Sequence, residues 1–214
     1  MKVCIAMLTL NEEENISFMI DEIKQRCPSY DLIIIDGFST DNTVKIAKEK
    51  GIPVYKREKH GYGNGIRTAI KVAYENEYDA LLKLDCDRTY PASHIKKLIE
   101  KIPEYDYAVG NRSMKNVEFG HRYPNMFFNI LTSIVYGKKF NDVNCGMWAM
   151  KPKKFHKLVK QDGWDVTIEL SIIAAKNKYK MAQIPIPYMT RVGDSKIKVR
   201  DGFTMLYRIL RNRF

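Results

Sequence analysis

The sequence alternates apolar runs of strand length with amphipathic segments of helix length, and this alternation constrains its fold most strongly. Strands are expected for KVCIAMLTL at 2–10, DLIIID at 31–36, IPVYK at 52–56 and DALLKL at 79–84. Between them we expect helices over 11–26, opened by Asn11, over 39–51 and over 66–77, with the glycine-rich HGYGNG at 60–65 as a loop. Strands that alternate with helices predict an α/β fold with a mostly parallel central sheet flanked by helices.

Length and composition indicate one folded domain. The chain has 214 residues, of which 45% are hydrophobic and 29% charged, as in ordinary globular proteins. No apolar run approaches the roughly 18 to 20 residues that a membrane span needs, and the start MKVCIAMLTLNEEEN turns acidic too soon for a signal peptide. We therefore expect a cytoplasmic protein. The four cysteines show no CxxC spacing, which predicts buried, reduced thiols.

The charge balance points to a partner that carries phosphate groups. Lys and Arg number 36 against 25 Asp and Glu, a formal net charge of +11. Such a balance suits a nucleotide, a nucleic acid or an anionic membrane. No basic stripe interleaved with aromatic residues and no helix-turn-helix pattern is present, so no nucleic-acid partner is expected.

Acidic and amide residues follow three of the expected strands. Asn11 and Glu12 come after the first strand, Asp36 after the second, and the pair Asp85 and Asp87 after the fourth. The carboxyl ends of parallel strands form one edge of a sheet, where such folds bind ligands. Two neighbouring carboxylates without nearby His or Cys suit Mg²⁺ or Mn²⁺ completed by substrate phosphates, although two acids in a surface turn are common. A cation between them would relieve the repulsion of the like charges.

Seven segments in order carry a family resemblance: LTLNEEENI, IIIDGFSTDNT, GYGNGIRTAI, LLKLDCDRTYP, VGNRS, DVNCGMWAM and IPIPYMTRVGDSK. Together they resemble family 2 glycosyltransferases with the GT-A, Rossmann-like fold, especially dolichyl-phosphate or polyprenyl-phosphate mannose or glucose synthases. The resemblance implies an inverting, metal-dependent enzyme that moves a hexose from a GDP-mannose or UDP-glucose type donor. Its acceptor would be polyprenyl or dolichyl phosphate, reached from the cytoplasmic face of an anionic membrane or through a membrane partner.

The resemblance also implies roles for individual positions. Asp85 and Asp87 would bind the metal. The expected catalytic groups are Asp85, Asp87, Arg112, Arg191 and Lys196. The expected donor-binding residues are Leu8, Thr9, Leu10, Asn11, Glu12, Ile35, Asp36, Ser39, Asp85, Cys86, Asp87, Arg191 and Lys196. Acceptor binding is expected at Arg112 and Ser195, and also at Arg122 and Asn129 in HRYPNMFFNIL.

The chain departs from the family pattern around the nucleoside. Leu8 and Leu10 stand where a proline and a tyrosine are usual, and Gly37 and Phe38 replace a usual Asp-Gly pair. These changes leave the donor base open.

The acceptor chemistry separates the alternatives. A phosphate acceptor is already an anion and needs positioning rather than a base, whereas a glycan hydroxyl would need a base. Asp142, Asp165 and Glu169 are the acids that could serve. A structural role, such as a turn or helix cap for Asp142, is favoured over catalysis for Asp142 and Asp165, whereas for Glu169 a carboxylate that holds an arginine or a helix end is as good an interpretation as a base. The alternative functions are a transferase acting on a glycan hydroxyl and a catalytically idle GT-A binding subunit.

We expect a nucleotide-sugar half at 1–110, an acceptor half at 111–196 and a basic amphipathic helix at 197–214. On that helix Phe203, Leu206, Tyr207 and Leu210 share one face, which suits either a membrane interface or docking on the domain. For Phe127, Phe128, Ile130, Leu131 and Ile134 a core position is favoured over a lipid groove.

Overall fold

The computed structural model describes residues 1–113, 117, 119–192, 198–211 and 213. Its strands are β1 (Val3–Thr9), β2 (Asp31–Asp36), β3 (Val54–Lys56), β4 (Ala80–Asp85), β5 (Tyr107–Arg112), β6 (Trp148–Met150) and β7 (Met181–Ile186). Its helices are α1 (Glu13–Arg26), α2 (Thr43–Glu49), α3 (Tyr62–Glu75), the short 3-10 helix η1 (Ala92–His94), α4 (Ile95–Ile99), α5 (Phe119–Tyr136), α6 (Pro152–Phe155), α7 (Val166–Lys176) and α8 (Val199–Arg211).

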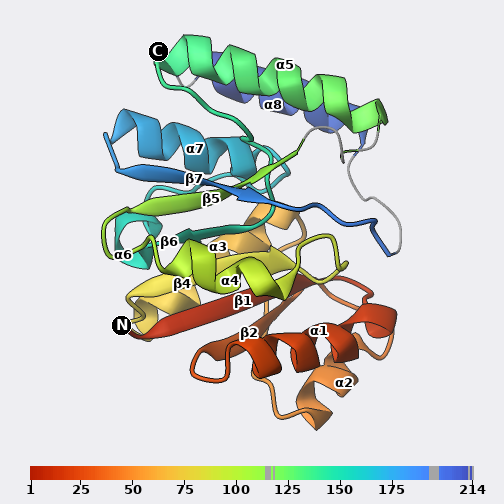
Figure 1. Cartoon of the computed structure of the whole chain (residues 1–214). Coiled ribbons are helices and arrows are strands. Elements are labelled where there is room, and N and C mark those ends of the chain that lie inside the picture. Colours follow the sequence, from red (N-terminus) through yellow and green to blue (C-terminus); the bar gives the residue numbers. More distant parts are fainter. Residues whose placement is uncertain (114–116, 118, 193–197, 212, 214) are drawn as a thin grey trace.

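The strands form one sheet in the order β3-β2-β1-β4-β6-β5-β7, with β6 antiparallel to both of its neighbours (Figure 1). The remaining pairings are parallel, so the predicted α/β class is confirmed. The chain proceeds from β1 to β2 and β3 in one direction, and then returns to place β4 on the other side of β1. This reversal makes the carboxyl ends of β1 and β4 a topological switch point, where α/β sheets bind ligands.

Helices cover the sheet on both sides, as Figure 1 shows with α1 and α4 in front and α3 behind. α1 packs on α2 and η1, whereas α3 packs on α6 and α7. The amphipathic character predicted for these segments is confirmed in two helices, because Ile16, Ile20 and Ile23 of α1 are buried. The corresponding buried residues of α3 are Ile66, Ala69, Ile70 and Ala73. All four cysteines are buried and free, as predicted.

All three predicted helices begin at residues other than those expected, and α2 starts at Thr43 rather than at residue 39. Asn11 does not open α1: its φ is 54°, its side chain accepts a hydrogen bond from the Thr40 amide at 2.8 Å, and the helix starts at Glu13. The glycine-rich stretch is not a loop, because α3 already starts at Tyr62. A Cβ at Gly63 would lie 2.1 Å from the Gln161 carbonyl oxygen. The glycine therefore serves close backbone packing rather than flexibility.

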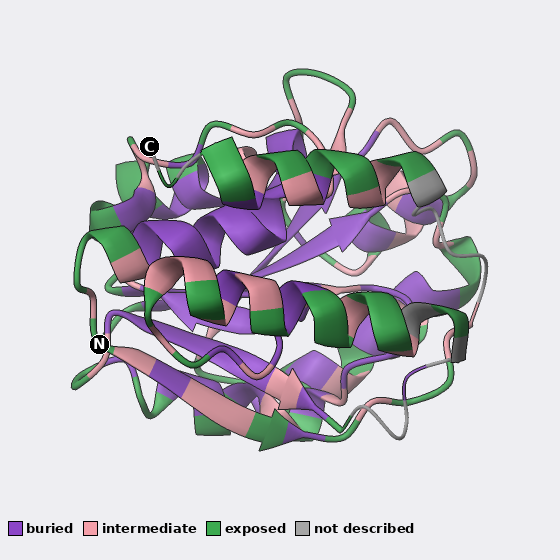
Figure 2. Ribbon diagram, turned by 90° about the horizontal axis from the view of Figure 1, so that it is seen from above, coloured by how far each residue is buried: buried purple, intermediate pink, exposed green. Residues whose placement is uncertain are grey.

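Helices α5 and α8 pack against each other in an outer layer beyond α7 (Figure 1). Met205 and Ile209 of α8 are buried with Phe128 of α5 in a second apolar cluster. The core position favoured for Phe127, Ile130 and Ile134 is wrong, because these side chains are exposed. Seen from above, the two helices present exposed and half-exposed residues along their outer surfaces (Figure 2). No helix within the described ranges combines the length and apolar character that crossing a bilayer requires.

Candidate active site

Strand register brings the predicted acidic residues to one rim. Leu8 of β1 pairs with Ile35 of β2 on one side and with Asp85 of β4 on the other. One residue further along, Thr9 pairs with Asp36. The convergence of these three strand ends, predicted from their order in the sequence, is therefore confirmed.

Asp36 organises the turn after β2. Its Oδ2 accepts hydrogen bonds from the amides of Phe38 at 3.0 Å and Ser39 at 3.1 Å, and Thr9 Oγ1 lies 3.4 Å from Oδ1. Phe38 adopts a φ of 70°, a region that glycine tolerates better, and a Cβ at Gly37 would lie 2.8 Å from the Thr9 carbonyl oxygen. Gly37 is thus required by the close approach of β1, whereas Phe38 occupies a backbone conformation that would suit the glycine usual at this position.

Asn11 and Glu12 connect the first strand end to the same turn. The Asn11 amide donates to Ser39 Oγ at 2.9 Å, and the Glu12 amide donates to Thr43 Oγ1 at 2.7 Å. Asn15 donates to Glu12 Oε2 at 2.9 Å and to the Val192 carbonyl oxygen at 3.2 Å. Asn11, Asp36 and Ser39, three of the predicted donor-binding residues, are therefore linked by hydrogen bonds around this turn, and Asn15 links Glu12 to the segment that contains Arg191.

Asp85 lies in a network that sequence reasoning missed. Lys83, fully buried in β4, donates to Asp85 Oδ1 at 2.6 Å, to the Gly146 carbonyl oxygen at 3.0 Å and to the Tyr62 hydroxyl. Tyr62 in turn donates to Asp85 at 3.1 Å. Burial and the charge of Asp85 raise the pKa of Tyr62, so its hydroxyl stays protonated at neutral pH. A Cβ at Gly146 would lie 2.4 Å from Asp85 Oδ2, so only glycine leaves room for this carboxylate.

Asp87 has a different set of partners. It forms an ion pair with Arg191 and accepts from Thr89 Oγ1 at 2.5 Å and from the Thr89 amide at 3.1 Å. Burial, followed by the charge of Asp85, raises the pKa of Asp87. Cys86 between the two acids is buried, which raises the pKa of its thiol well above the ordinary value. The site therefore contains two carboxylates with separate protein cations, Lys83 and Arg191.

Arg112 is held by the buried Asp142. Its Nε lies 2.6 Å from Asp142 Oδ2 and its second guanidinium nitrogen 2.8 Å from Oδ1, the planar two-point contact that arginine makes with carboxylates. The guanidinium also lies 5.0 Å from the ring centroid of Tyr188. Asp142 is thus the counterion of Arg112.

The other two acids considered as bases also have structural partners. Asp165 pairs with Arg208 at 3.0 Å, and Glu169 accepts the backbone amides of Lys160 and Gln161 at 3.1 Å. Burial raises the pKa of Glu169, and these amide hydrogen bonds oppose the shift.

A cavity of about 800 Å³ adjoins the rim. Its charged and polar end includes Asp85, Arg112, Asn144 and Arg191, and Trp164 stacks on Tyr62 in its wall with ring centroids 4.0 Å apart. Its other end runs between α5 and α8 and is apolar, lined by Phe127, Phe128, Phe203, Met205 and Leu206. The cavity is therefore amphipathic along its length.

Some of the predicted acceptor-binding residues do not line this cavity. Asn129 is buried; its Nδ2 donates to the Asn141 carbonyl oxygen at 2.6 Å, and its Oδ1 accepts from the Val143 amide at 2.9 Å. Arg122, like Asn129, is not among the lining residues, so both acceptor contacts stay predictions. Ser195 and Lys196 lie outside the described residues. Tyr62, Lys83 and Trp164 were missed, although a lysine inside the apolar run LLKLD was a usable signal.

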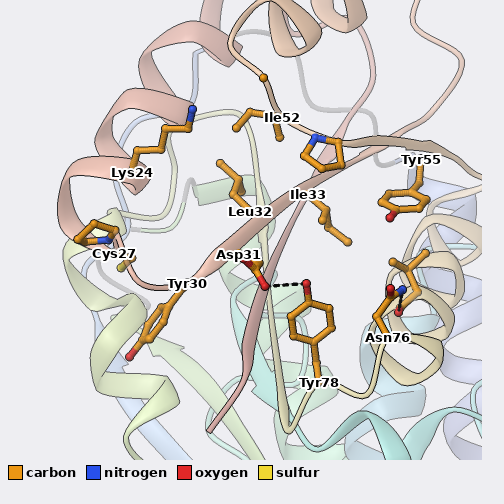
Figure 3. A pocket seen from close by; sticks show the side chains of 14 residues that line it. Lys24, Cys27, Tyr30, Asp31, Leu32, Ile33, Ile52, Tyr55, Asn76 and Tyr78 are labelled. Carbon is orange, nitrogen blue, oxygen red and sulfur yellow. Dashed lines mark hydrogen bonds between the residues drawn. The ribbon is translucent and has the colours of Figure 1, made fainter.

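A second cavity, of about 570 Å³, lies at the opposite ends of the strands (Figure 3). Asp31 at the start of β2 and Pro53 before β3 contribute to it, and Tyr78 donates to Asp31 at 2.8 Å. None of the rim residues is among its described lining residues, so the amphipathic cavity is the one that adjoins the predicted site.

The mostly parallel sheet, with two aspartates at its switch point beside a cavity, has the GT-A fold. The model of the family "Glycosyl transferase family 2" matches residues 4–159, and the chain belongs to this family of glycosyltransferases. The predicted family, fold and enzyme class are confirmed.

Relatives agree with this assignment, and a solved structure has the same fold. The chain is 30% identical over 200 residues to the dolichyl-phosphate hexose transferase of Haloferax volcanii, covering 91% of this chain and 86% of the relative. It is 27% identical to the UDP-N-acetylglucosamine–dolichyl-phosphate N-acetylglucosaminyltransferase of Methanococcus voltae, covering 94% and 91%. Glucosyl-3-phosphoglycerate synthase from Mycobacterium tuberculosis, solved with Mn²⁺, UDP-glucose and phosphoglyceric acid, superposes with a TM-score of 0.81 at 18% identity, covering 99% and 79%.

Proposed function

We propose that the protein transfers a sugar, with inversion, from a nucleotide-diphosphate donor to a polyprenyl phosphate. The observation that carries this proposal is the amphipathic cavity, whose charged end at Asp85 and Arg191 continues into the apolar space between α5 and α8. A lipid phosphate has the same distribution of charge and apolar surface. The relatives named for dolichyl-phosphate substrates support the same acceptor class.

The distribution of carboxylates favours a phosphate over a hydroxyl acceptor. Among the described residues that line the cavity, Asp85 is the only carboxylate. Asp142, Asp165 and Glu169 do not line it and have the structural partners given above. A hydroxyl acceptor needs a base within hydrogen-bond reach, whereas a phosphate oxygen attacks as the anion that it already is.

The reaction then needs positioning and charge compensation from this chain. A bond forms between an acceptor phosphate oxygen and the anomeric carbon, while the bond from that carbon to the donor diphosphate breaks and its electron pair leaves with the nucleotide. Arg112 and Arg191 at the cavity wall would orient the two anions, because a guanidinium stays charged at neutral pH. Trp164 and Tyr62 would close the wall beside the reacting groups.

The carboxylate pair fits a hard divalent cation that shares its coordination with substrate. The donor set offers only oxygen, and the described residues contain no group of three His, Cys, Asp or Glu that could hold a metal alone. Asp85 and Asp87 would hold Mg²⁺ or Mn²⁺, which supplies Lewis-acid neutralisation of the leaving diphosphate.

The outer surface of α5 and α8 would place the cavity at a membrane. Its large apolar side chains are strongly exposed, with Ile134 at 74%, Ile130 at 59% and Phe203, which also lines the cavity, at 71%. Exposed Arg200, Arg211 and Arg213 accompany them on α8 and beyond its end. Apolar side chains next to arginines suit an anionic lipid surface, and the apolar end of the cavity lies between the same helices.

A transfer assay tests the proposal. UDP-glucose, GDP-mannose and UDP-N-acetylglucosamine are each offered with Mn²⁺ to a short-chain polyprenyl phosphate, to the matching polyprenol and to a glycan. We expect transfer from one donor to the lipid phosphate alone. Asp87→Asn should lower the rate at least about a hundredfold, whereas Asp21→Asn, an exposed acid on α1, should leave it unchanged. Transfer to polyprenol or to the glycan would contradict the proposal.

A further inference from the structure

Lys83 is a cation built into the centre of the sheet. It lies in β4 between β1 and β6, its side chain is 0% exposed, and burying an ammonium group is costly unless it is paired. Its three donors meet three acceptors, on Asp85, Tyr62 and Gly146. The ammonium group is thus fully satisfied in the absence of any ligand.

The two carboxylates of the site differ in how firmly their cations are placed. Arg191, the partner of Asp87, has a side chain that is 28% exposed and lies in the segment after β7. Lys83 is enclosed by the strand and by Tyr62, whose ring centroid lies 4.7 Å from Nζ. The positive charge beside Asp85 is therefore a permanent part of the site.

We infer that Lys83 is an internal counterion that weakens the binding of a free divalent cation at Asp85 and Asp87. A dication placed on these carboxylates is repelled by the ammonium group, which lies 2.6 Å from Asp85 Oδ1. A nucleoside diphosphate brings the negative charge that offsets this repulsion. The inference rests on the proposed metal-dependent transfer and deepens it, because the cation then binds tightly only together with the donor diphosphate. Lys83 acts through Asp85 and is a positioning residue.

Mn²⁺ titration of the nucleotide-free protein tests the inference, by calorimetry or by the electron paramagnetic resonance signal of free Mn²⁺. Lys83→Met, which removes the ammonium group and keeps an unbranched side chain one atom shorter, should bind Mn²⁺ at least about tenfold more tightly than the parent protein. Lys83→Gln should shift the affinity in the same direction while it retains a hydrogen-bond donor. Lys153→Met, which removes an exposed cation on α6, should leave the affinity unchanged. Unchanged or weaker Mn²⁺ binding in both Lys83 variants would overturn the inference.

The stability of the metal-free variants separates this inference from the proposed function. Lys83→Met and Asp85→Asn should each lower the midpoint of urea unfolding, and the double variant should recover part of the loss, because each single change leaves a charge unpaired. Strictly additive losses would contradict the ion pair whatever the metal does. If the parent protein bound no Mn²⁺ even with UDP or GDP, the proposed metal site would be contradicted. The unfolding measurements on the single and double variants would still test the ion pair between Lys83 and Asp85.

Discussion

Trp164 and Tyr62 connect the wall of the cavity to the carboxylates of the rim. Their rings stack with centroids 4.0 Å apart, and the Tyr62 hydroxyl donates to Asp85. Trp164 belongs to the segment before α7, and α3 provides Tyr62, so the contact joins distant parts of the chain. A substitution of Trp164 should therefore affect acceptor binding directly, and should affect Asp85 only through Tyr62.

Trp164→Leu should raise KM for the lipid phosphate at least about threefold, because the stacked wall loses part of its contact area. Donor affinity, measured by calorimetry with the nucleotide sugar, should change less than twofold. Tyr74→Leu is the matched control, since Tyr74 stacks on His156 at 3.8 Å and does not line the cavity. An equal effect of both variants would show that Trp164 acts only through general stability.

Some features of the candidate site could be predicted from single residues in the sequence, and others could not. The rim acids could be predicted because parallel strands end at a common edge, whichever side chains follow. Lys83 could have been found as well: it shares a strand face with Asp85, two residues on, and a lysine buried in a central strand requires an acidic partner. Arg191 could not be assigned to Asp87, because nothing local links residues 104 positions apart. The sequence indicated that Asp85 and Asp87 need a nearby positive charge, and the protein supplies two, on Lys83 and Arg191.

At the level of elements, the long apolar strands could be predicted and the short β6 could not. β1, β2 and β4 are near-continuous apolar runs bounded by polar residues, as is typical of strands buried on both faces. β6 has only three residues, and its antiparallel insertion between β4 and β5 depends on tertiary pairing. The early start of α3 was hidden because two glycines in its first turn indicate a loop, unless the packing against Gln161 and Asp162 is known.

The start of β5 is held by one carboxylate that connects three segments. Asp106, just before the strand, pairs with Lys151 at 3.1 Å and Lys154 at 3.0 Å and accepts the Lys180 amide at 3.2 Å. Burial would raise the pKa of Asp106, but these lysine and amide contacts outweigh it and lower the pKa below its ordinary value. The charged form is therefore favoured by folding.

Because the folded-state pKa of Asp106 is lowered, its contribution to stability is present above its unfolded-state pKa of about 4 and is lost as the pH falls through the folded-state value. Asp106→Asn should lower the free energy of unfolding at pH 7 by about 1 kcal/mol, since both lysines are partly exposed to solvent. It should also flatten the loss of stability on acidification. Urea unfolding of both proteins between pH 3 and 7 measures this difference, and parallel curves would contradict it.

On the scale of the whole molecule, the apolar surface of α5 and α8 lies at one end of the sheet, whereas α1 and α2 lie at the other (Figure 1). Its exposed members include Phe127 and Ile134 of α5 and Phe203 and Tyr207 of α8. This arrangement could not be predicted from the amphipathic pattern alone, because that pattern fits docking on the domain as well as a membrane interface. The structure shows that α8 packs with Met205 and Ile209 and keeps a second apolar face outward.

The double variant Phe203→Ser, Tyr207→Ser should lower the partition into vesicles that contain anionic lipid at least about tenfold, because two large apolar side chains no longer enter the interface. Sedimentation with vesicles measures the bound fraction. Phe18→Ser on α1, which removes a ring that is 50% exposed at the other end of the molecule, is the control. Added salt should weaken the binding of the parent protein. Equal partition of all three proteins would argue against this surface as the membrane contact.

The position of β6 in the sheet also affects how the chain folds during its synthesis. β6 pairs with both β4 and β5, so the sheet is joined across its middle only by the strand that ends at Met150. While the chain emerges from a ribosome, the edge of β4, with Lys83 in its centre, has no partner strand until residues 148–150 have been synthesised. An apolar strand with an open edge pairs readily with other chains. A fragment that ends near residue 110 should therefore aggregate rather than behave as an independent nucleotide-binding unit, so the two halves mature together.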